Sequence, residues 1–127
     1  MDNEQKQKLA LKFLSILGKP DASVVKDVAV EDVIWTFPGT AQISGEAHGV
    51  DAIMKRAHTI ASYKVKVEIV RTVYGFSGAS VILHNTGEKD GKVLDEHLAA
   101  VFSFRGDKIE RLDTHLSDVP MVKAFFG

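Results

Sequence analysis

The sequence predicts an α+β fold in which helices come first and an antiparallel sheet follows. Apolar residues recur at helical spacing in the first part of the chain, residues 32–37 alternate in the manner of a strand, and four strand-like runs follow residue 62 with no helix between them. This order is typical of helices packed on a meander. We therefore predict three N-terminal helices on a strongly bent, mostly antiparallel sheet, with a pocket between them.

The first helix is predicted over residues 4–17, where apolar side chains form a stripe with helical period. Asp2 and Gln5 have the spacing of a capping box, which satisfies free backbone N–H groups at a helix start. Gly18 and Pro20 then end the helix.

Two further helices are predicted before the meander. Asp21 can cap a short second helix whose inner face includes Val28. The third helix covers residues 49–62 and buries Ile53 and Ala57, among others.

The first strand, residues 32–37, points its large apolar side chains to one face, because side chains alternate along a strand. Trp35 and Phe37 lie on that face, and we expect them to form the floor of the pocket. Pro38 lacks a backbone N–H and ends the strand, and we predict a short return strand at about 41–44.

The meander is predicted as four strands followed by a short terminal helix or tail. The strands cover residues 64–74, 79–87, 93–104 and 108–116, and the tail covers 121–126. The apolar pattern changes phase near Ile69, which indicates a bulge or a strong bend.

Composition excludes several classes of function. A length of 127 residues predicts one domain, residues 1–127, and a net charge of −1 gives no basic surface for nucleic acid. The absence of cysteine removes disulfides and thiolate metal sites. No signal-like or membrane-spanning run is present, so we expect a cytoplasmic protein without a membrane partner. We also expect no cofactor.

The combined pattern resembles the nuclear transport factor 2-like superfamily, and within it the branch of SnoaL-like polyketide cyclases and ketosteroid isomerases. The resemblance rests on the Trp35-x-x-Pro38-Gly39 strand, the Gly45-x-x-x-Gly49 lead into the third helix, and the bent meander. It implies a cone-shaped fold, a hydrophobic pocket and a homodimer. It does not specify a reaction, because one fold hosts many functions.

The catalytic residues that the resemblance implies are not matched in this chain. The isomerase tyrosine falls on Phe13, the general base on Phe37, and the protonated aspartate on Ala100. The cyclase histidine falls near Ala100, and the cyclase aspartate falls near Thr114. Asp113 is adjacent to Thr114, but neighbouring strand residues point to opposite faces.

A different acid/base pair is predicted from the hairpin between the second and third meander strands. If residues 89–91 form a three-residue loop with glycine in the left-handed position, Ile82 pairs with Leu98 and His84 with Glu96. A carboxylate beside an imidazole in an apolar cavity can act in general acid/base catalysis. The same pair could instead be a cross-strand contact with no catalytic role.

Two other registers change the partner of His84. A slip of one residue places His84 opposite Asp95, and a two-residue loop places it opposite His97. We predict no metal site, because the neighbours Asp95, Glu96 and His97 diverge along a strand.

Together with these residues, the resemblance implies a domain that binds a small hydrophobic molecule of polyketide, steroid or terpenoid type and that could be an enzyme of isomerase, cyclase or hydrolase type. His84 and Glu96 are then the catalytic candidates. A non-catalytic binding module and a protein-interaction or dimerisation module are the alternatives. A two-fold dimer is expected through the outer sheet face, around His97 and His115. The predicted ligand-binding residues are Phe13, Trp35, Phe37, His58, Ile82, Leu98, Ala100, Phe102 and Thr114.

Overall fold

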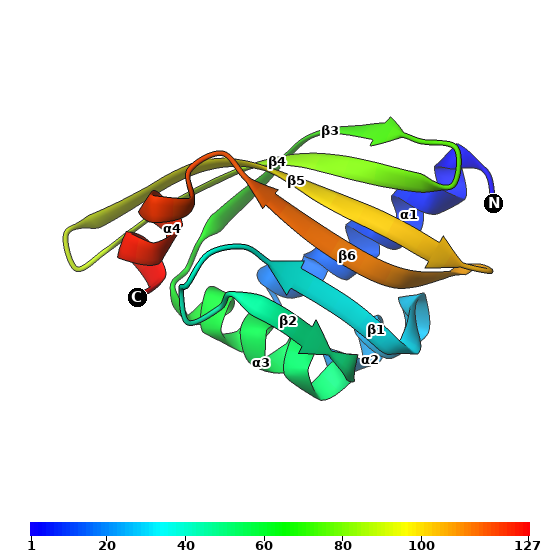
Figure 1. Cartoon of the computed structure of the whole chain (residues 1–127), viewed down its shortest axis with the longest axis horizontal. Helices are drawn as coiled ribbons and strands as arrows, with labels where there is room; N and C mark the ends of the chain where they lie inside the picture. Colours follow the sequence, from blue (N-terminus) through cyan, green and yellow to red (C-terminus); the bar gives the residue numbers. More distant parts are fainter.

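Helices pack against one face of a six-stranded sheet in the computed structural model, which describes residues 1–127 (Figure 1). The predicted α+β class with three N-terminal helices is confirmed. The elements are α1 (Asn3–Leu14), a 3-10 turn (Ser15–Leu17), α2 (Ala22–Val28), β1 (Ala29–Phe37), β2 (Gly45–His48), α3 (Gly49–Ser62), β3 (Lys66–Tyr74), β4 (Gly78–Lys89), β5 (Lys92–Arg105), β6 (Lys108–Leu116) and α4 (Val119–Phe126).

The helix starts follow the side-chain chemistry of the sequence. In the capping box of α1, the Gln5 backbone N–H donates to Asp2 Oδ1 at 2.8 Å, and the Asp2 N–H donates to Gln5 Oε1 at 3.0 Å. Asp21 caps α2 by accepting from the backbone N–H of Ser23 at 2.9 Å. Both predicted caps are therefore present.

The strands run in the order β2-β1-β6-β5-β4-β3, and only β1 and β6 are parallel neighbours. The register of β3 against β4 shifts between Ile69 and Arg71, which confirms the irregularity predicted near Ile69. The shift bends β3 and helps the sheet curve around the helices.

The return strand starts at Gly45 rather than at about residue 41, so that prediction is wrong by four residues. Ala41 and Ile43 are buried in the loop before β2 although they pair with no strand. A hydrogen bond from the Ser44 hydroxyl to the Pro38 carbonyl, 2.9 Å long, closes this loop. Because alternate residues of this loop are buried, its sequence has the alternating apolar pattern of a strand.

The β4–β5 hairpin has a two-residue loop, Asp90 and Gly91, and the predicted three-residue loop is wrong. Both residues have positive φ, 53° and 77°. An Asp-Gly pair in this conformation matches the twist of the two strands. The resulting register places His84 opposite His97, as the two-residue alternative required.

Aromatic side chains join α1 to the sheet at the centre of the core. The Phe13 ring lies edge-on to Trp35 at 6.2 Å and to Phe102 at 6.0 Å between centroids. Burying each such side chain contributes roughly 1.5–3 kcal/mol to folding. None of the helices combines the length and the apolar character needed to cross a lipid bilayer.

Candidate functional site: a cavity between the sheet and helices α3 and α4

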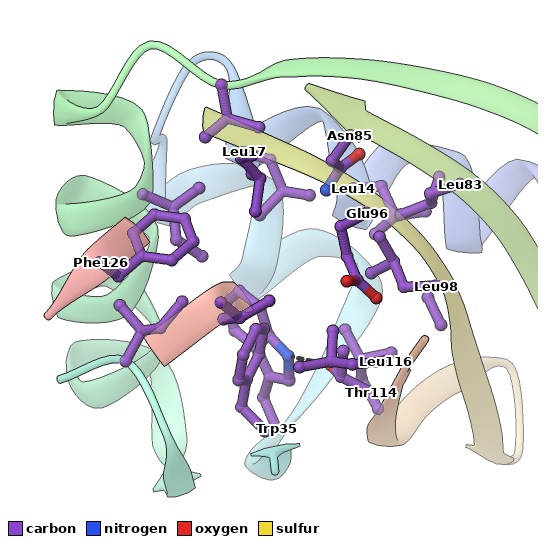
Figure 2. A pocket seen from close by; sticks show the side chains of 18 residues that line it. Leu14, Leu17, Trp35, Leu83, Asn85, Glu96, Leu98, Thr114, Leu116 and Phe126 are labelled. Atoms are coloured by element: carbon purple, nitrogen blue, oxygen red, sulfur yellow. Dashed lines mark hydrogen bonds between the residues drawn. The ribbon is translucent and has the colours of Figure 1, made fainter. Parts of the chain in front are cut away.

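A small cavity lies between the inner face of the sheet and the helices, and Figure 2 shows the side chains around it. Its volume is about 40 Å³, and 15 of its 18 lining residues are hydrophobic. The lining residues are Leu14, Leu17, Trp35, Phe37, Ile43, Ile60, Val65, Leu83, Asn85, Leu94, Glu96, Leu98, Ala100, Leu112, Thr114, Leu116, Val122 and Phe126.

The C-terminal helix closes one side of this cavity. Val122 and Phe126 of α4 are buried and contribute lining side chains. The Phe126 carbonyl accepts hydrogen bonds from Gln42 Nε2 at 2.5 Å and from the Tyr63 hydroxyl at 3.0 Å. α4 is therefore held against the loop before β2 and the end of α3.

Glu96 is the one carboxylate in the cavity wall, and it is 2% exposed. Its Oε1 accepts from the backbone N–H of Ser117 at 2.5 Å and from the Ser117 hydroxyl at 2.9 Å. Its Oε2 accepts from the backbone N–H of Asp118 at 3.1 Å. Since both oxygens have donors, Glu96 anchors the connection between β6 and α4.

Asn85 supplies a polar atom with no partner in the cavity wall. It pairs with Glu96 across β4 and β5, and Figure 2 shows the two side chains next to each other. The Asn85 Oδ1 atom is buried and has no hydrogen-bond partner. An unpaired buried oxygen costs about 1–3 kcal/mol, so a donor entering the cavity would be stabilised there.

A hydrogen bond between two of the predicted ligand-binding residues crosses the floor of the cavity. The indole Nε1 of Trp35 donates to Thr114 Oγ1 at 2.9 Å, drawn as a dashed line in Figure 2. Thr114 faces inward and Asp113 faces outward, as the predicted register required. The position that the resemblance assigns to the cyclase aspartate therefore holds a hydroxyl.

Arg56 of α3 supports the cavity floor, a role that was not predicted from the sequence. Its guanidinium donates to the backbone carbonyls of Trp35 at 2.6 Å and Gly45 at 2.9 Å, and it lies 4.9 Å from the centroid of the Trp35 ring. Burial lowers its pKa to about 10, so it remains charged at neutral pH. The sequence does contain a signal for the burial of Arg56, because it lies at helical spacing from the buried residues Ile53 and Ile60.

The predicted pair of His84 and Glu96 does not form. His84 lies opposite His97 on the outer face, whereas Glu96 lies opposite Asn85 on the inner face. The two-residue loop shifts the register by one residue, and this reverses which side chains of β4 face the cavity. Ile82 is corrected for the same reason: it pairs with Ala99 on the outer face.

The other predicted residues divide between the cavity and its surroundings. Trp35, Phe37, Leu98, Ala100 and Thr114 line the cavity. The side chains of Phe13 and Phe102 are buried in the core but do not line it, and His58 is exposed on α3.

Comparisons with known proteins place the fold. No family model and no curated protein matches the chain. Among solved structures, Bal32a from a soil-derived mobile gene cassette superposes with a TM-score of 0.88 at 21% sequence identity, over 98% of each chain. An NTF2-like protein from Burkholderia xenovorans LB400 superposes with a TM-score of 0.85 at 17% identity, over 100% of this chain and 99% of the other.

The chain has the nuclear transport factor 2-like fold. A candidate SnoaL-like polyketide cyclase from Jannaschia sp. CCS1 shares this fold, with a TM-score of 0.71 at 13% identity over 90% of this chain and 86% of the other. The nuclear transport factor 2-like architecture predicted from the sequence is thus confirmed. Identities this low establish a common fold and leave the reaction open.

Proposed function

We propose that the chain is a non-catalytic module that binds a small, mostly apolar molecule carrying one hydrogen-bond donor. The observation that supports this most directly is the unpartnered Asn85 Oδ1 in an otherwise apolar cavity. Ligand sites typically combine apolar walls with a few polar groups that orient the ligand. Glu96 is occupied by backbone and hydroxyl donors, and His84 lies outside the cavity. The acid/base pair of the enzyme hypothesis is therefore absent.

The small volume of the cavity limits the size of a ligand that can bind without movement of the protein. About 40 Å³ is far below the roughly 300–1,000 Å³ of ordinary ligand pockets. A larger ligand requires Val122 and Phe126 to move outward with α4, at the expense of the hydrogen bonds to the Phe126 carbonyl. Binding and displacement of α4 are therefore coupled in this proposal.

Cyclohexanol is a suitable probe, because it has one apolar ring and one hydroxyl donor. Trp35 is the single tryptophan and lies in the cavity wall, so its fluorescence reports on occupancy. We expect a saturable change with one site per chain, and a weaker response to cyclohexane, which has no donor for Asn85. Asn85→Leu should remove this preference for cyclohexanol.

Neighbouring alanines provide a matched pair of variants. Ala100→Leu fills the cavity and should abolish cyclohexanol binding, while Ala99→Leu adds the same volume on the outer face and should leave binding unchanged. Circular dichroism verifies that both variants fold. Absence of a saturable response in the parent chain, or binding that survives Ala100→Leu, would refute the proposal.

An interaction module is the second candidate function, and the small volume of the cavity favours it. The outer face groups Ala99, Val101 and Asp113 with His97 and His115, as predicted, and we propose that a second copy packs there. Sedimentation velocity at micromolar concentration tests this dimer. A monomer at all concentrations, together with cyclohexanol binding, would leave only the ligand-binding function.

A further inference from the structure

We propose that His84, Asp95 and His97 bind a divalent transition-metal cation of the zinc class on the outer face of the sheet. One ligand atom from each residue lies within 4.8 Å of the other two. The two imidazoles and one carboxylate match the donor types that zinc takes in proteins. This site is separate from the cavity and does not depend on the proposed ligand.

The strand register brings these side chains to one place. His84 lies directly opposite His97, and Asp95 lies two residues before His97 on the same face of β5. The two imidazole rings stack in parallel, with centroids 4.3 Å apart and planes 4° apart. Because the lone pair of an imidazole nitrogen lies in the ring plane, one of the two stacked rings must rotate before both present a nitrogen to the same cation.

Side-chain rotations separate this arrangement from a coordinated site, because the candidate ligand atoms lie within 4.8 Å of one another and a bound cation would draw the more distant of them closer. His84 Nε2 and Asp95 Oδ1 are 2.6 Å apart, whereas ligand atoms around tetrahedral zinc, with bonds of about 2.0–2.1 Å, lie about 3.3 Å apart. The hydrogen bond between them would open by less than an ångström as the cation replaces the shared proton. In the single chain the side chains of His84 and Asp95 are 30% and 61% exposed, so they can rotate without disturbing the buried core.

Glu68 on β3 lies near His84 and would become an orienting partner if its carboxylate moved into hydrogen-bond range. It pairs with His84 across the strands, and its Oε1 lies 3.7 Å from His84 Nδ1. Histidines that bind metals commonly donate their second ring N–H to a carboxylate, which fixes the ring and leaves the other nitrogen free for the metal. Glu68 would thereby direct Nε2 of His84 toward the cation and act as a positioning residue.

The ligand set also predicts selectivity. Imidazole nitrogens favour zinc, nickel and copper, whereas magnesium and calcium favour oxygen ligands alone. Three protein ligands leave a fourth position for water. Zn²⁺, Ni²⁺ and Cu²⁺ should therefore bind, and Mg²⁺ and Ca²⁺ should not compete with them.

Isothermal titration of the full chain with ZnCl₂ tests the proposal. We expect saturable binding of one Zn²⁺ per chain, together with shifts of the His84 and His97 ring nitrogens in NMR spectra. His84→Gln, His97→Gln and Asp95→Asn should each weaken binding about tenfold or more, and Glu68→Gln about tenfold. These positions border solvent, so the variants should remain folded, as circular dichroism would verify.

His48→Gln is the matched control. His48 also contacts a carboxylate, Glu46, at 2.8 Å, but these two residues belong to no group of three ligands. As a further control, His115→Gln removes an exposed imidazole of the same sheet face that is not part of the proposed site. The proposed site would be overturned if Zn²⁺ binding did not saturate. It would also be overturned if either control variant lost as much Zn²⁺ affinity as the variants of His84, Asp95 and His97. One Zn²⁺ per two chains with zinc-dependent dimerisation would overturn it as well, because the ligands would then come from two chains.

Discussion

Trp35 and Thr114 are joined by a hydrogen bond from the indole Nε1 to the hydroxyl oxygen, 2.9 Å long, between β1 and β6. The two residues are 3% and 7% exposed. Apart from the Thr114 hydroxyl, the cavity floor that they share is largely apolar. The bond therefore fixes the orientation of the largest side chain in the cavity wall.

Replacing Thr114 by valine should destabilise the chain by about 1–3 kcal/mol, because the buried Trp35 N–H loses its acceptor while the volume hardly changes. Urea denaturation followed by Trp35 fluorescence measures this. Thr114→Ser keeps the hydroxyl and should lose less stability than Thr114→Val. If the Thr114→Val variant unfolds at the same urea concentration as the parent chain, the hydrogen bond contributes nothing to stability.

Glu96→Gln should destabilise the chain by about 1.5–3 kcal/mol, because hydrogen bonds to a charged acceptor are replaced by weaker ones. Glutamine also turns an N–H group toward one of the donors of Ser117 or Asp118. Glu88→Gln removes an exposed carboxylate from the same hairpin and serves as the control. Equal midpoints of the two variants in urea would show that Glu96 does not anchor α4.

The stability contributed by Asp113 should depend on pH. Burial raises the pKa of Asp113, but hydrogen bonds from the Thr36 hydroxyl and the Arg111 guanidinium outweigh it, so the pKa lies below its ordinary value of 3.8. A carboxyl group with a lowered folded pKa stabilises the fold above its unfolded pKa, and this stability is lost as pH falls through the folded pKa.

Asp113→Asn should therefore destabilise the chain at about pH 6 and lose this effect as the pH falls below the ordinary pKa of 3.8 and through the lowered pKa of folded Asp113. Thermal unfolding of parent and variant across this range gives the difference directly. A difference that is constant with pH would mean that the charge of Asp113 does not contribute.

Gly78→Ala should destabilise the chain by about 1–3 kcal/mol through overpacking. A Cβ atom at this position would lie 2.6 Å from the Phe102 backbone carbonyl oxygen, which a strand cannot easily move. Gly18→Ala, which meets nothing within 4 Å, is the control and should be neutral or slightly stabilising. Differential scanning calorimetry measures both, and a neutral Gly78→Ala would contradict the predicted clash.

Much of the fold was predictable because its signals are local. The caps of α1 and α2, the 49–62 helix and the inward face of Trp35 and Phe37 depend on residues close together in sequence. Side-chain alternation and helical spacing act over a few residues, so they can be read without knowing what packs against them.

The site was less predictable because it depends on register. Asp90-Gly91 forms a two-residue turn, and one residue of difference moved His84 from the cavity face to the outer face beside His97. Asn85 could not be recognised as the polar atom of the cavity until this register was known.

The sequence by itself determined the order of helices and strands, the helix ends and the bend near Ile69, because backbone propensity and side-chain periodicity are local properties. Tertiary structure alone decided that Glu96 binds the start of α4, that Arg56 reaches the carbonyl of Trp35, and that His84 stacks on His97. Those contacts join residues that are far apart in the chain. Their existence depends on strand register and helix placement, which are set by the packing of the whole core.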